Sequence, residues 1–335
     1  MQKVANKMAL IVLVLLTISF VTFSAISYQK SKDTILQMSK DSKEAAAIAS
    51  EIFIDDFFST TIFVVEGFES YIKENPEILH DKERFKNELA ILARTSDANE
   101  LFMGFEDTGE IIGAEIKQGA KPTIYTLGAK DNYNVKTRNW YNQMLSNNGA
   151  LTFSDPYTTS TGKYAMSVGK AVIINGKIVG AIGADIYIDD LKEALVEIKD
   201  TQTSSVSITD IKRGLYIYNE DFKNILSKDA TSIERNKALL KGYNEFGNAG
   251  FEYHINGIGD RVAACKVYEE ANWLVCSANY MSDYDEILNE VLTSQLVFSI
   301  LFIIIIVAIL VFAINYFLRP LSGISNGLNS FFKFL

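Results

Sequence analysis

Histidine, cysteine and proline are all scarce in this sequence. Its 335 residues include two histidines, two cysteines and four prolines. Zinc sites need clustered Cys and His ligands, and disulfide-stabilised domains need many cysteines, so both classes are excluded. The two histidines, His80 and His254, lie far apart in the sequence and are expected to be surface or structural residues.

The sequence also lacks the common catalytic motifs. It contains neither the Gly-x-Ser-x-Gly elbow of hydrolases nor the Gly-x4-Gly-Lys loop that holds nucleotide phosphates. Gly257-Ile258-Gly259 lacks the third glycine of a dinucleotide-binding loop and is interpreted as a turn. We therefore expect no enzyme activity, no cofactor, and no catalytic or metal-binding residues.

An excess of positive charge is missing as well. Of the 32 basic residues, only Lys3, Lys7, Arg319 and Lys333 lie outside residues 29–295, whereas all 41 acidic residues lie inside this range. The range thus carries 28 basic and 41 acidic residues, a net charge of −13. A nucleic-acid-binding surface needs the opposite sign, so no nucleic-acid partner is expected.

What the sequence does contain is two long, uncharged apolar runs near its ends. They comprise 21 residues at 8–28 and 23 residues at 296–318. About 20 apolar residues cross the hydrocarbon core of a bilayer, so both runs are predicted to be transmembrane helices. Ala25-Ile26-Ser27 resembles a signal-peptidase site, but the first run is longer than a usual signal-peptide core, so we interpret it as a retained anchor.

Two spans place both ends of the chain on the same side of the membrane. Two lysines precede the first span (Lys3 and Lys7) and two follow it (Lys30 and Lys32), so the charges around this span do not indicate its orientation in the membrane. Arg319 directly after the second span favours cytoplasmic ends. We expect residues 1–7 to be cytoplasmic and the large part between the spans to lie outside.

The part between the spans changes from helical to strand periodicity. Residues 29–79 are predicted to form one long stalk helix, which Pro76 ends or interrupts. Residues 80–199 and 200–281 are each predicted to form an antiparallel-sheet module, followed at 282–318 by a helix that includes the second span. Asn175-Gly176 between two apolar strands predicts a type I′ hairpin. The fold class is α+β, with two stacked modules on a long N-terminal helix, flanked by two transmembrane helices.

The most specific chemical pattern lies between residues 133 and 185. Arg138, at a predicted helix start, offers a planar fork of donors that suits a carboxylate. Asp185, at the end of an otherwise apolar strand, offers a negative charge that suits an ammonium group. Four aromatic residues complete the candidate site: Tyr133, Trp140, Tyr141 and Tyr157. This set suits a small zwitterion such as a free amino acid better than it suits a reaction.

Each of these residues also has an ordinary structural interpretation. An arginine near a tryptophan on a helix is often only a stacked surface pair. Asp185 ahead of a helix can belong to a turn, and Tyr157 after Pro156 can be a packing residue. Their order and spacing favour the binding interpretation.

That spacing resembles a known family. Tyr133-x4-Arg138-x-Trp140-Tyr141, then Pro156-Tyr157 and Gly183-Ala184-Asp185, is similar to the motif of amino-acid-binding double-Cache sensor domains. These are extracytoplasmic parts of bacterial methyl-accepting chemotaxis receptors in the cytoplasmic (inner) membrane. The resemblance implies PAS-like Cache modules, with the ligand in the membrane-distal module (80–199) rather than the membrane-proximal one (200–281). It also implies that Arg138 and Trp140 grip the carboxylate, while the tyrosines and Asp185 hold the amino group.

One position departs from the family pattern. The family has a second Asp two residues after the tyrosine that matches Tyr157, and this sequence has Thr159 there. Asp155, two residues before Tyr157, is a candidate substitute, although strand alternation can direct it elsewhere. With one acid fewer around the ammonium group, a related amine or a small carboxylate remains an alternative to an amino acid.

The two cysteines, Cys265 and Cys276, face each other if residues 269–272 form a hairpin loop. Directly opposed cysteines can form a cross-strand disulfide. The alternative is two buried thiols that pack as small apolar side chains.

The resemblance implies a transmembrane chemoreceptor that binds a small periplasmic ligand and dimerises along its long first helix. Arg319-Pro320-Leu321 resembles the start of a HAMP linker at residues 319–335, so we expect a fragment or a truncated product. Chemotaxis adaptor and kinase would then bind only through a missing C-terminal region. One alternative is the sensor half of a histidine kinase or diguanylate cyclase, which the same modules precede. A truncated, anchored binding protein with no output is a third interpretation.

Overall fold

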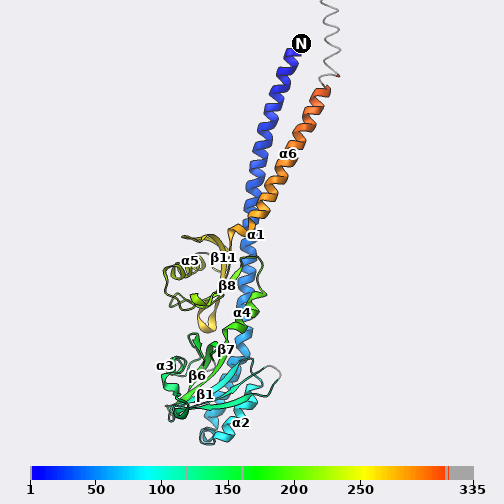
Figure 1. The fold of residues 1–335 in the computed structure, drawn as a ribbon. Coiled ribbons are helices and arrows are strands. Elements are labelled where there is room, and N and C mark those ends of the chain that lie inside the picture. The colour runs from blue at the N-terminus through cyan, green and yellow to red at the C-terminus, as the bar shows by residue number, and fades with distance from the viewer. Residues whose placement is uncertain (1, 118–119, 160–161, 314–315, 317–335) are drawn as a thin grey trace, which may run out of the picture. The chain divides into compact units, whose positions relative to one another are not determined.

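The computed structural model describes residues 2–117, 120–159, 162–313 and 316. Contacts divide the chain into two compact units, one of residues 1–39 with 281–335 and one of residues 40–280. Helix α1 (Gln2–Glu74) contributes to both units (Figure 1). The predicted start of a HAMP linker at Arg319-Pro320-Leu321 lies outside the described residues.

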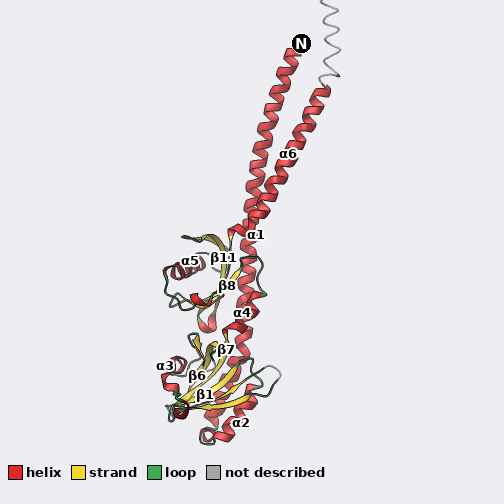
Figure 2. Ribbon diagram, viewed as in Figure 1, coloured by secondary structure: helices red, strands yellow, loops and turns green. Residues whose placement is uncertain are grey.

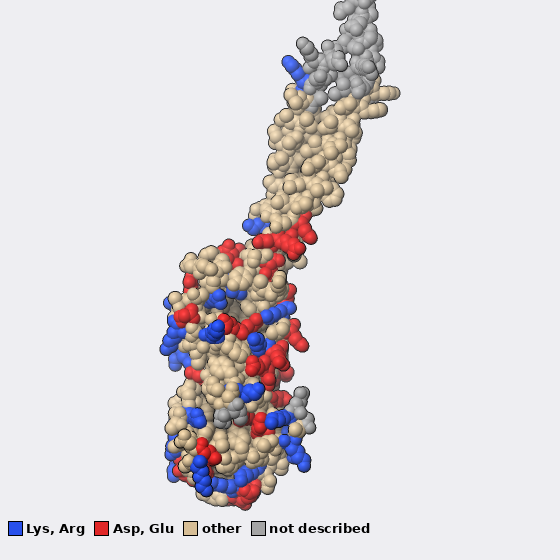
Figure 3. Space-filling view, viewed as in Figure 1, with Lys and Arg blue, Asp and Glu red and all other residues tan. Residues whose placement is uncertain are grey.

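The first unit contains the two apolar segments. The first part of α1 packs against α6 (Asp285–Ala313): the Phe20 and Phe302 rings are 6.0 Å apart, and the Ser24 and Ser299 hydroxyl oxygens are 3.2 Å apart. Both helices are long and apolar enough to cross a membrane, and their most apolar windows are not buried within the protein. Figure 3 shows the visible surface of these segments almost free of charged side chains.

The second unit contains two antiparallel sheets, which confirms the predicted α+β fold class. The first sheet has seven strands in the order β3-β2-β1-β7-β6-β4, with β5 also paired to β6 (Figure 2). Its strands are β1 (Glu100–Phe105), β2 (Ile111–Glu115), β3 (Thr123–Leu127), β4 (Thr152–Phe153), β5 (Tyr157–Thr158), β6 (Tyr164–Ile174) and β7 (Lys177–Tyr187).

Different helices cover the two faces of this sheet, because successive side chains of a strand point to opposite faces. Leu101 and Met103 of β1 pack in a cluster with α1 and α2 (Lys82–Ala93). Phe102, between them, packs on the other face with residues of α3 (Asn139–Ser146). Figure 1 draws α2 and α3 on opposite sides of these strands.

The hairpin between β6 and β7 forms at the predicted turn. Asn175 and Gly176 have φ values of 50° and 76°, and Ile174 pairs with Lys177 across them. Positive φ at both central residues is what a type I′ turn requires, and Asn-Gly adopts it at little cost. The prediction is confirmed.

Helix α3 begins one residue later than the sequence indicates. Arg138 is its N-cap residue, with an extended backbone (φ −91°, ψ 136°). Thr137, which a helix starting at Arg138 would use as its cap, instead donates its hydroxyl to the Asn134 carbonyl oxygen at 2.8 Å. The periodicity also gives no sign of β4 and β5, since strands of two residues each are too short to show a period.

The second sheet has five strands in the order β10-β11-β12-β8-β9. Helix α5 (Ala230–Phe246) packs on one face, whereas α1 and α4 (Ile188–Val196) pack on the other. Its strands are β8 (Ser205–Asp210), β9 (Leu215–Asn219), β10 (Phe251–Ile255), β11 (Gly259–Tyr268) and β12 (Trp273–Tyr280). The short 3-10 turns of the chain are η1 (Pro76–His80), η2 (Ala129–Asp131), η3 (Val135–Thr137), η4 (Phe222–Asn224), η5 (Glu269–Ala271) and η6 (Met281–Tyr284).

One aromatic side chain of α1 contacts residues of both sheets. Phe58 is fully buried, and its ring lies 5.3 Å from that of Phe153 in β4. It also lies 6.2 Å from Tyr268 and 6.0 Å from Trp273 in the second sheet. Aromatic pairs at these separations add to the stabilisation from buried area, so this cluster joins α1 to both sheets.

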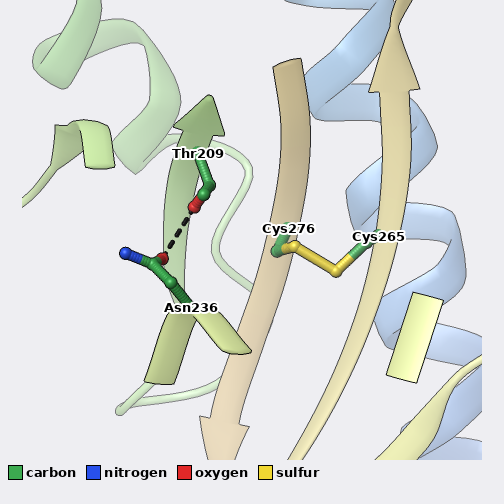
Figure 4. The surroundings of a disulfide bond; sticks show 4 residues. All are labelled: Thr209, Asn236, Cys265 and Cys276. Atoms are coloured by element: carbon green, nitrogen blue, oxygen red, sulfur yellow. Dashed lines mark hydrogen bonds between the residues drawn. A yellow bond between two sulfur atoms is a disulfide. The ribbon is translucent and has the colours of Figure 1, made fainter. Parts of the chain in front are cut away.

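The two cysteines lie on adjacent strands of the second sheet. Cys265 and Cys276 are register partners, and their Sγ atoms are bonded at 2.08 Å. Figure 4 shows this disulfide beside the hydrogen bond from the Thr209 hydroxyl to the Asn236 side-chain oxygen, which is 2.8 Å long. The α5 face of this sheet therefore combines a covalent crosslink with a buried polar pair.

We predict that Phe58→Ala lowers the free energy of unfolding by about 3–5 kcal/mol, because it leaves a cavity among large buried rings. Ile91→Ala is the control, since Ile91 is 58% exposed on α2. The measurement is denaturant unfolding of the full chain in detergent, followed by tryptophan fluorescence. Equal effects of the two substitutions would contradict the central role of Phe58.

We also predict that the denatured, non-reduced chain does not react with a thiol alkylating reagent. After reduction, it should take up one alkyl group each at Cys265 and Cys276. Intact mass spectrometry distinguishes the two states. Alkylation of both cysteines before reduction would support the interpretation of two buried thiols.

Candidate functional site

A cavity of about 170 Å³ lies on the α3 face of the first sheet. Its lining includes Glu100 and Phe102 of β1, Asp185 of β7, and Arg138 and Trp140 at the start of α3. Pockets for drug-sized molecules usually measure roughly 300–1,000 Å³. The cavity is therefore suited to a smaller molecule.

Asp185 is a buried acid in this lining, with 3% of its surface exposed. Its carboxylate accepts hydrogen bonds from the Ser167 hydroxyl at 2.6 Å and from the Tyr157 hydroxyl at 2.7 Å. Ser167 is its register partner on β6, which explains why the two side chains share a face. Burial raises the pKa of Asp185 to about 7, against the opposing effect of these hydrogen bonds, and the charge of Glu100 adds to the increase.

Glu100 is a second buried acid in the same lining, also 3% exposed. It is the register partner of Asp185 across the β1–β7 pair. Its carboxylate accepts hydrogen bonds from the Tyr125 hydroxyl at 2.8 Å and the Tyr187 hydroxyl at 3.1 Å. Burial raises the pKa of Glu100, the two tyrosines oppose this, and the charge of Glu115 adds to it.

The position of Tyr125 depends on a glycine. Tyr125 on β3 is the register partner of Gly113 on β2. A Cβ atom at Gly113 would lie 2.3 Å from the Tyr125 ring. The absence of a side chain thus lets the Tyr125 ring lie across β2. From there, its hydroxyl reaches Glu100 on the next strand.

The cationic side of the cavity is formed by the segment before α3. The Arg138 guanidinium lies 4.4 Å from the centre of the Tyr133 ring, within the range of a cation–π contact. The Arg138 Nε atom is buried without a hydrogen-bond partner among the described residues. Trp140 forms a wall, and its ring packs edge to face on Phe102 at 4.8 Å. Arg138 thus has donor capacity that no described side chain uses at Nε.

The charged side chains that line this cavity do not form ion pairs with one another. No ion pair found among the described residues includes Arg138, Asp185 or Glu100. Within the same part of the chain, no group of three or more His, Cys, Asp or Glu side chains could hold a metal ion. The cavity combines one guanidinium with two carboxyl groups that are held by hydroxyls.

Six of the eight predicted ligand residues line the cavity: Tyr133, Arg138, Trp140, Tyr157, Thr159 and Asp185. Tyr141 does not, because it is fully buried in the packing under α3 and donates its hydroxyl to Glu106 at 2.8 Å. Asp155 is also outside the lining. Its carboxylate pairs with the Arg213 guanidinium at 2.7 Å.

Glu100 and Tyr125 also line the cavity, although neither is predicted as a site residue from the sequence. Glu100 is the first residue of an otherwise apolar strand, a position where a charged side chain is usually solvated. Its importance follows only from the pairing of β1 with β7, since that register places it opposite Asp185. The only signal in the sequence is an acid at the start of an apolar strand.

Comparison with known proteins agrees with this architecture. A family model described as a Cache domain matches residues 27–291. The chain belongs to the Cache domain family. No curated protein sequence matches it closely enough to be called a relative.

Solved structures resemble this Cache domain over most of their length. The ligand-binding domain of the Campylobacter jejuni chemoreceptor Tlp3, in complex with L-valine, has a TM-score of 0.53 and 19% identity, over 76% of this chain and 97% of that one. The ligand-binding domain of Mlp24 with asparagine has a TM-score of 0.53 and 16% identity, over 77% and 98%. That of the Pseudomonas aeruginosa PAO1 amino acid chemoreceptor PctB with L-Arg has a TM-score of 0.53 and 12% identity, over 72% and 95%. At these identities, the likeness concerns the fold.

The buried Asp185 predicts a specific pH dependence of stability. Its pKa is about 7 in the folded protein, against a normal value of 3.8. Between these values the folded state retains a proton that the unfolded state has lost, so the stability of the ligand-free protein falls as pH rises from about 4 to about 7. The full difference corresponds to at most about 4 kcal/mol.

We predict that Asp185→Asn removes this contribution, so that the variant gains stability over the wild type as pH rises through the window. Denaturant unfolding at several pH values measures the difference. Asp189→Asn is the control, because Asp189 is exposed in the first turn of α4. A difference between Asp185→Asn and wild type that is independent of pH would contradict the assignment.

Proposed function

We propose that this Cache domain is the sensor region of a transmembrane chemoreceptor and binds a small zwitterion, most simply an amino acid, in the cavity beside α3. The observation that carries the proposal is that Arg138 and Asp185 line one small cavity although they lie 47 positions apart in the sequence. A ligand with both charges would satisfy both side chains.

The chemistry of the two groups supports this assignment. Carboxylates bind arginine through two parallel hydrogen bonds, and the buried Arg138 Nε is a donor without a partner among the described residues. An ammonium group offers three donors and a positive charge, which suits the Asp185 carboxylate. Tyr133 and Trp140 add flat walls, while Thr159 adds a short polar side chain to the lining. The amino acids named with the Tlp3, Mlp24 and PctB domains support the same ligand class.

Placement in a membrane and signalling belong to the same proposal. The two apolar helices support a multi-pass protein of the bacterial cytoplasmic membrane, with the modules at 80–199 and 200–281 in the periplasm. Exposed apolar side chains along α1, such as Met38, Ile52 and Phe63, support a homodimer along this helix. Ligand would favour one of two arrangements by binding it more tightly, and the change would pass to α6 and onward to chemotaxis partners.

We predict that an amino acid raises the melting temperature of the full chain in detergent. At about 100 times Kd, a rise of roughly 5–10 °C is expected for a domain of this size. The probes are L-alanine, L-valine, L-isoleucine, L-asparagine, L-glutamine and L-arginine. Arg138→Ala and Asp185→Ala should each lose the rise, because each leaves one ligand charge unpaired.

Arg94→Ala is the matched control, since Arg94 is exposed at the end of α2 and outside the cavity lining. It should respond as the wild type does. A full response in Arg138→Ala would exclude the proposed carboxylate contact, and no response to any probe in the wild type would contradict the ligand class.

A further inference from the structure

The cavity has more negative than positive side chains, although its ligand is proposed to be a zwitterion. Arg138 is the one basic residue among the described residues of its lining, whereas Glu100 and Asp185 are both acidic. The two acids are direct neighbours across β1 and β7. Residues opposite each other in an antiparallel pair have Cα atoms about 4.5–5.5 Å apart, so one small cation can contact both carboxylates.

Glu100 also compensates for the lack of the acid that the family pattern has at the position of Thr159. Where the family has a second acid after Tyr157, this chain has a threonine, and the nearby Asp155 pairs with Arg213 instead. Glu100 supplies a second carboxyl group to the cavity from a different strand. It is held there by Tyr125, whose ring lies across Gly113.

We infer that Glu100 is the second acidic ligand of the ammonium group, and that the cavity accepts ligands with an ammonium group and rejects those with only a carboxylate. This inference rests on the proposed function, because it concerns the same cavity. A carboxylate without an ammonium group would add a further negative charge beside the two acids. An ammonium group would instead lie between them and donate to both.

Binding should also be coupled to a proton. Two neighbouring buried carboxyl groups cannot both ionise easily, since each is desolvated and repels the other. The raised pKa values of Asp185 and Glu100 agree with a pair that retains a proton near neutral pH. When the ammonium group binds, its positive charge replaces that of the proton. The carboxyl pair then releases the proton to the buffer.

The other groups around the pair do not remove this effect. Glu115, the partner of Glu100 on β2, adds negative charge and pairs with Lys117 at 3.4 Å. Among the described residues, the other titratable or charged side chains that contact the pair or line its cavity are Tyr125 on β3, Tyr133 and Arg138 before α3, Tyr157 on β5, and Tyr187 on β7. The pKa values of Tyr125, Tyr133 and Tyr157 are raised, chiefly by burial, so these phenols stay neutral.

The test compares L-alanine and L-valine with propanoate and 3-methylbutanoate, which are the same acids without the amino group. Binding to the full chain in detergent is measured by calorimetry at about pH 7, in two buffers with different ionisation enthalpies. We expect the wild type to bind at least one amino acid and to release part of a proton, and to bind the deamino acids at least tenfold more weakly.

Glu100→Gln should weaken amino-acid binding at least tenfold and suppress the proton release, while binding the deamino acids as well as or better than the wild type does. Glu193→Gln is the matched control, since Glu193 is exposed on α4 and lies outside the cavity lining. It should behave as the wild type does. Melting temperatures without ligand verify that both variants are folded, and Glu100→Asp provides a second variant that keeps the charge.

The outcomes separate the two proposals. Amino-acid binding and proton release that survive in Glu100→Gln would overturn the role of Glu100 and leave the proposed function intact. Propanoate and 3-methylbutanoate that bind as tightly as the amino acids would overturn the ammonium requirement. No binding of any probe to the wild type would overturn the proposed function, and this inference with it.

Discussion

The register between β1 and β7 is the constraint on which the candidate site depends. It places Glu100 opposite Asp185, while the next residue, Leu101, points into the core formed with α1 and α2. A slip of β1 by one residue would turn Glu100 into that apolar core and away from Asp185. Both faces of the sheet are covered, so the hydrophobic side chains of β1 and β7 fix the register. The position of the charges follows from packing.

The burial of these acids gives the site its chemical character. Hydroxyl groups satisfy part of the hydrogen-bonding capacity of Asp185 and Glu100 but bring no positive charge. Buried carboxyl groups without a cation have raised pKa values and reduce stability once ionised. Ligand-binding sites often retain such unfavourable features, because the ligand removes the cost and the gain contributes to affinity. The same reasoning applies to the unpartnered Arg138 Nε.

Much of this architecture follows from the sequence. Period-two strands, the Asn175-Gly176 turn and the long helical pattern of residues 29–79 predict elements that the structure contains. Arg138 can be selected because it stands at a predicted helix start near aromatic residues, and Asp185 because it is a charge at the end of an otherwise apolar strand. Glu100 cannot be selected in this way, because its significance depends on which strand lies beside β1. Sequence period gives the face of a residue but not its cross-strand neighbour.

The partner of Asp155 could not be read from the sequence either. Its ion pair also connects the two sheets. Asp155 stands two residues before Tyr157, yet its side chain pairs with Arg213, which follows β8 and also pairs with Asp210 at 2.8 Å. Tyr157 donates to Asp185 in the cavity, so the segment that contacts the candidate ligand site is also held by the second sheet.

A change in the position of Tyr157 on ligand binding would therefore act directly on a contact between the sheets. Phe58 adds a second such contact, since its ring touches both Phe153, which shortly precedes Tyr157, and Trp273 of the second sheet. A ligand can shift this arrangement only by binding two states with different affinity. Because Asp185 forms hydrogen bonds with Tyr157, an ammonium group that competes for the Asp185 carboxylate is one physical source of that difference.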